Sequence, residues 1–314
     1  MNSTTADSLG LSPVLVALRT CFIAIIALLI ISGNILSIAV TCRVTNLADS
    51  TKVLMTSLAV SDLLVGFLSL FYTIASALNK WPFGNMGCQI SMICSTACFT
   101  MSILSLTFLN VERYVAITRP YKFPLWCTGR RAITLVVVAS TLGLSAGPFS
   151  LLLFNQTAKY FAGPTICFFS NTSPVFSITN LLVADLYPTF LMVFIYYRLI
   201  KISRQHEQRL NQNGNNEANN NHDNKALKTF LVVTLTFFGC YTPFLLVNAA
   251  ESFTGVPSPN WLQFLTVWLN TSNSMFNVWI YCLFNSSFRQ VAKAILLKTL
   301  PFPCRDRSVA PVVI

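Results

Sequence analysis

Seven long apolar runs dominate this sequence, and they constrain its fold more than any other feature. They occupy residues 14–40, 53–78, 88–117, 132–154, 176–200, 227–249 and 261–284. A helix crosses the roughly 30 Å hydrocarbon core of a bilayer with about 20 apolar residues, so each run is long enough to span. Only 10% of all residues are charged, whereas soluble domains carry roughly 25%. The sequence therefore predicts an all-α membrane protein in which seven transmembrane helices form a single domain over residues 1–298.

Basic residues gather on one side of these runs and set the orientation. If the N-terminus lies outside, only Arg19, Lys80 and Lys159 of the 21 Lys and Arg residues face outward. Because basic residues are retained on the cytoplasmic side, we expect the N-terminus outside and the C-terminus inside. The net charge of +11 follows from this sorting and does not form a stripe for nucleic acid. The expected large partner is the lipid bilayer.

Three polar segments complete the predicted organisation. Residues 205–224 are rich in asparagine and carry too little apolar surface to order themselves, so we expect a mobile cytoplasmic loop. Residues 286–297 place apolar and basic side chains at helical spacing, which predicts an amphipathic helix on the inner leaflet. The cytoplasmic tail at 299–314 contains Cys304, which is either a palmitoylation site or a plain reduced thiol.

Two cysteines stand apart because they fall in outer segments. Cys88 begins the third run and Cys167 lies between the fourth and fifth, whereas the others lie within runs or face the reducing cytosol. We therefore expect a disulfide between Cys88 and Cys167. The acceptor motifs at Asn2, Asn155 and Asn171 also lie in outer segments and are predicted glycosylation sites.

Short motifs recur along the runs at the spacing of one receptor family. They are Gly33-Asn34, the segment 58–62 ending in Asp62, Cys88 with Glu112-Arg113-Tyr114, Pro188 with Tyr196, the segment 238–243 ending in Pro243, and Asn273, Asn277 and Tyr281. Through these residues the chain resembles a rhodopsin-class (class A) G-protein-coupled receptor over nearly its whole length. It departs from the family pattern at Val138, Tyr241 and Val278, where the family usually has Trp, Trp and Pro. The last two lie where the family's bundle moves on activation, so we expect the switch to be tuned differently.

The resemblance implies a switch at the inner end of the bundle. Its residues would be Glu112, Arg113, Tyr114, Tyr196, Asp223 and Tyr281. Arg113 is expected to pair with Glu112 and Asp223 in the resting receptor. Once the sixth helix swings outward, as in related receptors, Arg113 would meet Tyr196, Tyr281 and a G protein.

The resemblance also implies a sodium site at mid-membrane. It would be formed by Asp62, Ser102, Asn273 and Asn277. Burying the charged Asp62 carboxylate deep within a span costs free energy unless an ion or another group pairs with it, and a bound sodium ion would be such a partner. Alternatively, Asp62 is a protonated, hydrogen-bonded acid. Apart from this ion, no cofactor is expected.

An outer pocket is implied as the ligand site. Its predicted lining comprises Ser95, Thr96, Phe99, Phe169, Asn180, Ala184, Tyr241, Phe244, Leu245, Asn248, Val267, Trp268 and Thr271. Apolar walls with a few amides suit a small neutral ligand, and Phe169 with Asn248 resembles the adenine-binding pair of adenosine receptors. Ser95 stands where amine receptors carry aspartate, which argues against a typical amine receptor. The alternative is a biogenic or trace amine with Asp185 as counter-ion if that residue faces the pocket; if it faces the sixth helix, which its helical phase favours, Asp185 is a protonated packing acid. Thr271 stands where opsins carry the Schiff-base lysine, so a light receptor is not expected.

The expected function is therefore that of a plasma-membrane receptor that binds a small extracellular ligand and activates heterotrimeric G proteins. The resemblance makes arrestin a further candidate partner at the inner face. The sequence contains no evident metal cluster, nucleophile and base pair, or phosphate-binding glycine loop, so an enzyme is not expected. A transporter is a remote alternative, since neither repeated halves nor paired broken helices are evident.

Overall fold

The computed structural model describes residues 11–45, 47–153, 157–170, 182, 187, 189–198, 201–202 and 217–299, with the backbone alone described at 153, 170, 217–228, 230 and 298–299. The helices are α1 (Pro13–Thr41), α2 (Asp49–Ala77), α3 (Gly84–Thr118), α4 (Phe123–Trp126), α5 (Gly129–Leu153), α8 (Glu217–Thr254), α9 (Asn260–Phe284) and α10 (Ser286–Thr299). The strands are β1 (Thr157–Phe161) and β2 (Ile166–Ser170). A shorter apolar helix, Thr189–Arg198, belongs to the fifth predicted span.

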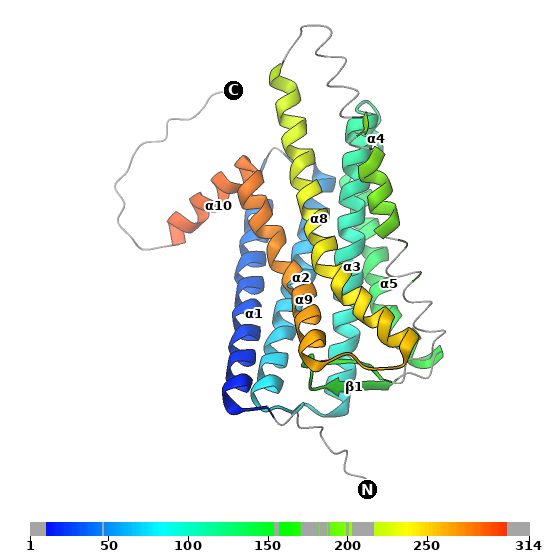
Figure 1. The fold of residues 1–314 in the computed structure, drawn as a ribbon. Coiled ribbons are helices and arrows are strands. Elements are labelled where there is room, and N and C mark those ends of the chain that lie inside the picture. Colours follow the sequence, from blue (N-terminus) through cyan, green and yellow to red (C-terminus); the bar gives the residue numbers. More distant parts are fainter. Residues whose placement is uncertain are drawn as a thin grey trace.

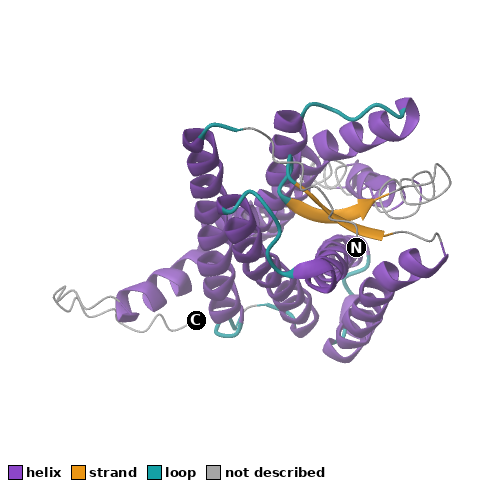
Figure 2. Ribbon diagram, turned by 90° about the horizontal axis from the view of Figure 1, so that it is seen from below, coloured by secondary structure: helices purple, strands orange, loops and turns teal. Residues whose placement is uncertain are grey.

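The long helices stand side by side as one bundle (Figure 1). α2 packs against α1, α3 and α5, while α9 packs against α1 and α8. At one end the antiparallel β1–β2 hairpin lies across the bundle, as the view from that end in Figure 2 shows. At the other end α10 turns away from the axis of α9 (Figure 1). The hairpin therefore marks the predicted outer end of the molecule, and α10 marks the predicted inner end.

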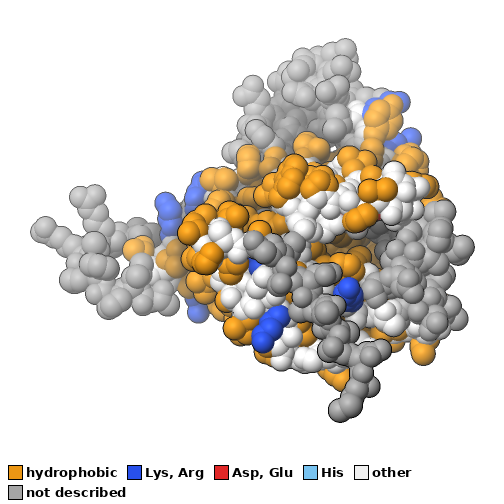
Figure 3. Space-filling model, turned by 60° about the horizontal axis from the view of Figure 1, so that its bottom comes forward, with side chains coloured by type: hydrophobic (Ala, Val, Ile, Leu, Met, Phe, Trp, Pro, Cys, Tyr) orange, Lys and Arg blue, Asp and Glu red, His pale blue; other side chains and the backbone are white. Residues whose placement is uncertain are grey.

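Polarity explains how these helices are placed. α1, α2, α3, α5 and α8 are long and apolar enough to cross a membrane, and apolar side chains cover much of the surface seen in Figure 3. α9 is not among these five described spans, because a polar run from Asn270 to Ser274 interrupts it. Ser272, Asn273 and Ser274 are buried in the bundle. Polar side chains that lipid cannot solvate are thus turned into the protein interior.

The β1–β2 hairpin is fixed to the bundle at three places. A disulfide joins Cys167 of β2 to Cys88 of α3, with 5.4 Å between their Cα atoms, which confirms the predicted pairing. Trp268 of α9 donates a hydrogen bond from Nε1 to the Pro164 carbonyl oxygen at 3.0 Å. Arg19 of α1 donates to another carbonyl oxygen of the turn, also at 3.0 Å. The hairpin was not predicted, because its strands are only five residues long and carry no clear alternation.

Predicted and observed elements differ mainly on the inner side. α8 begins at Glu217, so residues 217–224 are helical where a loop was predicted. Extending an existing helix adds one hydrogen bond for each residue ordered, which offsets the modest helix propensity of asparagine. α4 was also not predicted. Pro124 stands in its first turn, where the missing N–H of proline has no helical partner to lose.

Several predicted sites lie outside the described residues. They are the glycosylation sites Asn2, Asn155 and Asn171, the palmitoylation site Cys304, the pocket residues Asn180, Ala184 and Asp185, and the fifth-span Pro188. The backbone of Asp223 lies in α8, but its side chain is not described. The ion pair between Arg113 and Asp223 therefore stays a prediction.

Candidate functional site

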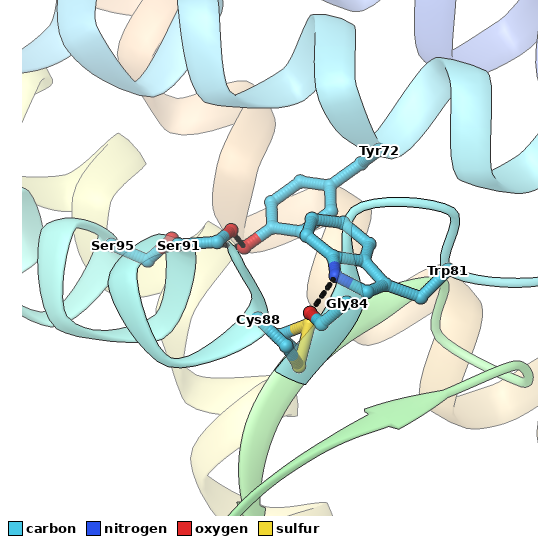
Figure 4. The surroundings of a disulfide bond; sticks show 7 residues. Tyr72, Trp81, Gly84, Cys88, Ser91 and Ser95 are labelled. Atoms are coloured by element: carbon cyan, nitrogen blue, oxygen red, sulfur yellow. Dashed lines mark hydrogen bonds between the residues drawn. A yellow bond between two sulfur atoms is a disulfide. The ribbon is translucent and has the colours of Figure 1, made fainter. Parts of the chain in front are cut away.

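A cluster of three hydroxyl groups joins α2 and α3 beside the disulfide (Figure 4). Ser91 donates to the Tyr72 hydroxyl at 2.6 Å, and that hydroxyl lies 3.1 Å from the Ser95 hydroxyl. The Tyr72 ring packs against Trp81 and Trp268, with centroids 5.9 and 6.5 Å apart. Ser95 was predicted as a pocket residue, whereas Tyr72 and Ser91 were missed. The available signal was the spacing of Ser91 and Ser95, which puts both on one face of α3.

The described acid at the outer end is Glu251, and it is engaged at the rim. Its carboxylate accepts hydrogen bonds from the Ser258 backbone at 2.8 Å and from the Gln263 side chain at 2.9 Å. Burial raises the pKa of Tyr160 in β1 to about 12, and nearby Arg19 lowers it by a smaller amount. The Tyr160 phenol is therefore neutral at physiological pH. Tyr160 therefore brings no negative charge to the outer end, and the Glu251 carboxylate is hydrogen-bonded at the rim.

Aromatic rings form the floor of the predicted pocket. The Tyr241 ring lies 5.1 Å from Phe99 and 6.2 Å from Phe244, measured between centroids. Phe168 of the hairpin lies 6.5 Å from Phe244, edge to face. Tyr241 also stacks on Phe237, 5.5 Å away toward the inner side. The Tyr241 ring thus contacts rings of the pocket floor on one side and a ring of the core on the other.

Several polar residues of the predicted lining use their side chains within their own helices. Thr96 and Thr271 each donate to a carbonyl oxygen one turn earlier, at 3.0 and 2.9 Å. Asn248 donates from Nδ2 to the Phe244 carbonyl oxygen at 2.9 Å. A bidentate contact with adenine would need both the oxygen and the nitrogen of this amide. In this arrangement the Asn248 nitrogen is occupied.

The apolar residues of the lining divide between clusters. Val267 is buried with Tyr72 at the outer end, whereas Leu245 packs against the large core cluster that runs toward the inner end. Phe169 is buried beside the disulfide and meets Phe168 edge to face at 5.5 Å. Phe169 therefore packs as part of the hairpin's attachment to α3.

At mid-membrane the Asp62 carboxylate is buried and accepts three hydrogen bonds. Ser102 and Ser274 donate to Oδ1 at 3.1 and 2.8 Å, and Asn277 donates to Oδ2 at 2.8 Å. Ser274 was missed by the sequence analysis. Asn273, which was predicted to join this group, makes no such bond, and its buried Oδ1 has no hydrogen-bond partner among the described residues. Three of the four predicted sodium residues are thus brought together.

At the inner end α2 holds the charged pair of α3. Glu112 is 3% exposed and accepts hydrogen bonds through Oε1 from Ser50 and, at 2.8 Å, from Thr51. Arg113 donates to the same Thr51 hydroxyl at 2.6 Å and lies 3.9 Å from Glu112 Oε2. A buried charge needs such partners to be tolerated. Ser50 and Thr51 were missed because nothing local distinguishes them from other helix-start residues.

The remaining switch residues are tyrosines at the same end. Tyr114 is partly buried and packs with Tyr196. The Tyr196 hydroxyl donates to Asn110 at 2.9 Å, and the Tyr281 ring lies 5.6 Å from Phe288 of α10. In this structure Arg113 is thus bonded to α2 and Tyr196 to Asn110.

Comparison with known proteins agrees with this architecture. The family described as "7 transmembrane receptor (rhodopsin family)" matches residues 33–281. The Homo sapiens histamine H2 receptor is 29% identical over 279 residues, covering 86% of this chain and 77% of that protein. Dopamine receptor 1 of Drosophila melanogaster is 26% identical over 336 residues, covering 94% of this chain and 65% of that protein.

The fold has a close counterpart among solved structures. Squid rhodopsin superposes with a TM-score of 0.80 at 18% identity, covering 93% of this chain and 88% of that one. At this identity the likeness concerns the seven-helix fold alone. Since the family match spans most of the chain, the protein belongs to the rhodopsin family of seven-transmembrane receptors, and it is a multi-pass plasma-membrane receptor rather than an enzyme.

Proposed function

We propose that this receptor binds a small amine at the outer end of the bundle and activates heterotrimeric G proteins at the inner end. The observation that carries the signalling half is the pair of buried Glu112 and partly buried Arg113, which is tied to α2 through Thr51. Such a pair can be released by a change in helix position. The same inner face is the proposed site for arrestin.

Two observations favour an amine over an adenosine-like ligand. The relatives described above are named for histamine and dopamine, and the Asn248 nitrogen is bonded to its own helix. The rings of Phe99, Tyr241 and Phe244 offer π faces, which attract cations. Asp185 on the fifth span is the proposed counter-ion, since Ser95 provides only a hydroxyl.

A ligand screen tests this assignment. Cells expressing the receptor would be exposed to histamine, dopamine, other small amines and adenosine, with G-protein activation as the readout. For the best amine, Asp185→Asn should lower the potency by roughly 100-fold, because an ammonium would lose its charged partner in a desolvated pocket. The matched control is Asn248→Ala, which should leave that potency nearly unchanged. Activation by adenosine that Asn248→Ala abolishes would overturn the amine proposal.

We also propose that the Asp62 group holds a sodium ion. The oxygens of Ser102 and Ser274 contact the Asp62 carboxylate, and Asn273, the neighbour of Ser274 on α9, has a buried Oδ1 without a hydrogen-bond partner among the described residues. Hard cations prefer oxygen ligands. When bound, the ion would compensate the charge of the ionised Asp62 carboxylate. Without it, Asp62 would be a neutral, hydrogen-bonded acid.

A further inference from the structure

A closed ring of three hydrogen bonds joins three helices in the inner half of the bundle. The Tyr196 hydroxyl donates to Asn110 Oδ1 at 2.9 Å, and Asn110 Nδ2 donates to the Thr234 hydroxyl at 3.2 Å. The Thr234 hydroxyl donates in turn to the Tyr196 hydroxyl at 3.3 Å. Each side chain therefore donates once and accepts once. Asn110 belongs to α3, Thr234 to α8 and Tyr196 to the helix Thr189–Arg198.

The ring is buried, which makes its bonds matter. Asn110, Thr234 and Tyr196 are 0%, 1% and 6% exposed, so water does not readily replace a broken partner. A buried polar group left without its partner costs more than an average hydrogen bond contributes. The closed arrangement satisfies all three groups at once, so the ring favours this relative position of the three helices.

We propose that this ring is a closed-state lock in which Asn110 is a positioning residue that holds Tyr196 on α3 and the inner half of α8 against α3. The proposal rests on the proposed G-protein function, and it adds the element that keeps the unliganded receptor inactive. It is separate from the predicted pair between Arg113 and Asp223.

The position of the ring shows how it would open. Two of its three bonds involve Thr234, so movement of the inner half of α8 away from both α3 and the helix Thr189–Arg198 breaks both. Pro243 lies inside α8, about 13 Å from Thr234 along the helix axis toward the outer end. Proline removes a helical hydrogen bond and permits a bend at that point. The ring therefore lies on the part of α8 that would swing.

Release of the ring would also free Tyr196 for the switch. Asn110 and Arg113 are three residues apart on α3 and lie on the same face of the helix. When Tyr196 no longer donates to Asn110, the Tyr196 hydroxyl is about one helical turn of α3 away from the Arg113 side chain. While the ring is closed, Tyr196 is held away from the contact with Arg113 that is expected in the active receptor.

A matched pair of substitutions tests the lock. Thr234→Val keeps the shape of the side chain but removes the hydroxyl, whereas Thr234→Ser keeps the hydroxyl. Both variants and the parent would be purified in lipid nanodiscs without ligand. Two quantities would be measured: amide hydrogen exchange of residues 229–238 in the receptor alone, and basal nucleotide exchange on added G protein. For Thr234→Val we expect both rates to rise roughly 25-fold, the effect of losing the two hydrogen bonds of Thr234 at about fivefold each, while Thr234→Ser should resemble the parent.

The outcomes separate the lock from the broader function. Faster exchange confined to α8 in Thr234→Val alone supports the lock. Equal rates in Thr234→Val and the parent would overturn it, as would equal increases in both variants or faster exchange throughout the bundle. If the parent activates no G protein, the proposed signalling function fails, but amide exchange in the receptor alone still decides whether the ring holds α8.

Discussion

Thr51 shows how one hydroxyl group can hold a charged pair. Its Oγ1 donates to Glu112 and accepts from Arg113, so the acid and the base meet at the same atom. Ser50 adds a second donor to Glu112. Oε1 of Glu112 is therefore satisfied from α2, whereas the buried Oε2 has no hydrogen-bond partner among the described residues and lies 3.9 Å from Arg113.

Replacing Arg113 should separate ligand binding from signalling. Arg113 is expected to contact the G protein in the active receptor, and loss of a charge-assisted hydrogen bond costs roughly 1.5–3 kcal/mol. We therefore expect Arg113→Ala to reduce ligand-stimulated nucleotide exchange by at least about tenfold. Ligand affinity should change little. The control is Arg119→Ala, since Arg119 is exposed and stacks over Trp126 at 5.7 Å. Normal nucleotide exchange by Arg113→Ala would rule out the assigned role.

Sodium should stabilise the receptor through Asp62. Raising sodium at constant ionic strength should increase the thermal unfolding temperature by about 2–4 °C, because an ion that binds only the folded state adds free energy of unfolding. Asp62→Asn should abolish the increase. Asp49→Asn serves as the control, because Asp49 is exposed at the start of α2. An equal shift in Asp62→Asn and the parent would contradict the ion site.

The hairpin is the element that ties the outer ends of the helices together. It is bonded to α3 by the disulfide, to α9 through Trp268 and to α1 through Arg19. The hairpin links three helices that are distant in sequence, and these links limit how far the outer ends of the helices can separate. Helix movement is therefore expected at the inner end, where α8 and α10 lack such a cover among the described residues.

Loss of the disulfide should impair the whole outer end. Cys88→Ser and Cys167→Ser are each expected to lower surface expression strongly and to a similar extent, since removal of a native disulfide typically costs about 2–5 kcal/mol. Cys21→Ser is the control, because Cys21 is a free, exposed thiol on α1. Surface labelling and flow cytometry would measure expression. A normal level for either of the first two variants would show that the bond is dispensable.

Trp268 should control the hairpin without affecting the helices. Trp268→Phe keeps a ring but loses the donor to Pro164 and Thr165, so amide exchange of residues 157–170 should accelerate about fivefold for the loss of one net hydrogen bond. Trp279→Phe is the matched control, because Trp279 lies on the same helix but is 48% exposed. Equal exchange in the two variants would show that packing alone holds the hairpin.

At the scale of the whole molecule, the architecture follows from the sequence because the length and spacing of apolar runs are local properties. The disulfide followed too, since topology left Cys88 and Cys167 on the same oxidising side. The ring of Asn110, Tyr196 and Thr234 could not be predicted. Its bonds depend on how each helix rotates about its own axis, which is set by packing among all neighbours rather than by any local pattern.

The two ends of the receptor should be coupled in both directions. If a ligand favours the state that binds a G protein, that G protein must raise the ligand affinity by the same factor. We expect an increase of roughly tenfold, within the usual range for such coupling, when nucleotide-free G protein is added to the receptor in nanodiscs. Arg113→Ala should bind ligand with the lower affinity whether or not G protein is present. A ligand affinity that does not respond to G protein in the parent would show that the sites are independent.

The length of α8 determines how far its inner end moves when the helix bends at Pro243. The helix continues for about 39 Å from Pro243 to its inner end at Glu217. A rotation of about 10° at Pro243 would move that end by about 7 Å over this length, whereas Phe244, beside the pivot, would hardly move. A small bend at Pro243 therefore produces a large displacement at the inner end of α8. A ligand needs only to change the helix angle near the pocket floor.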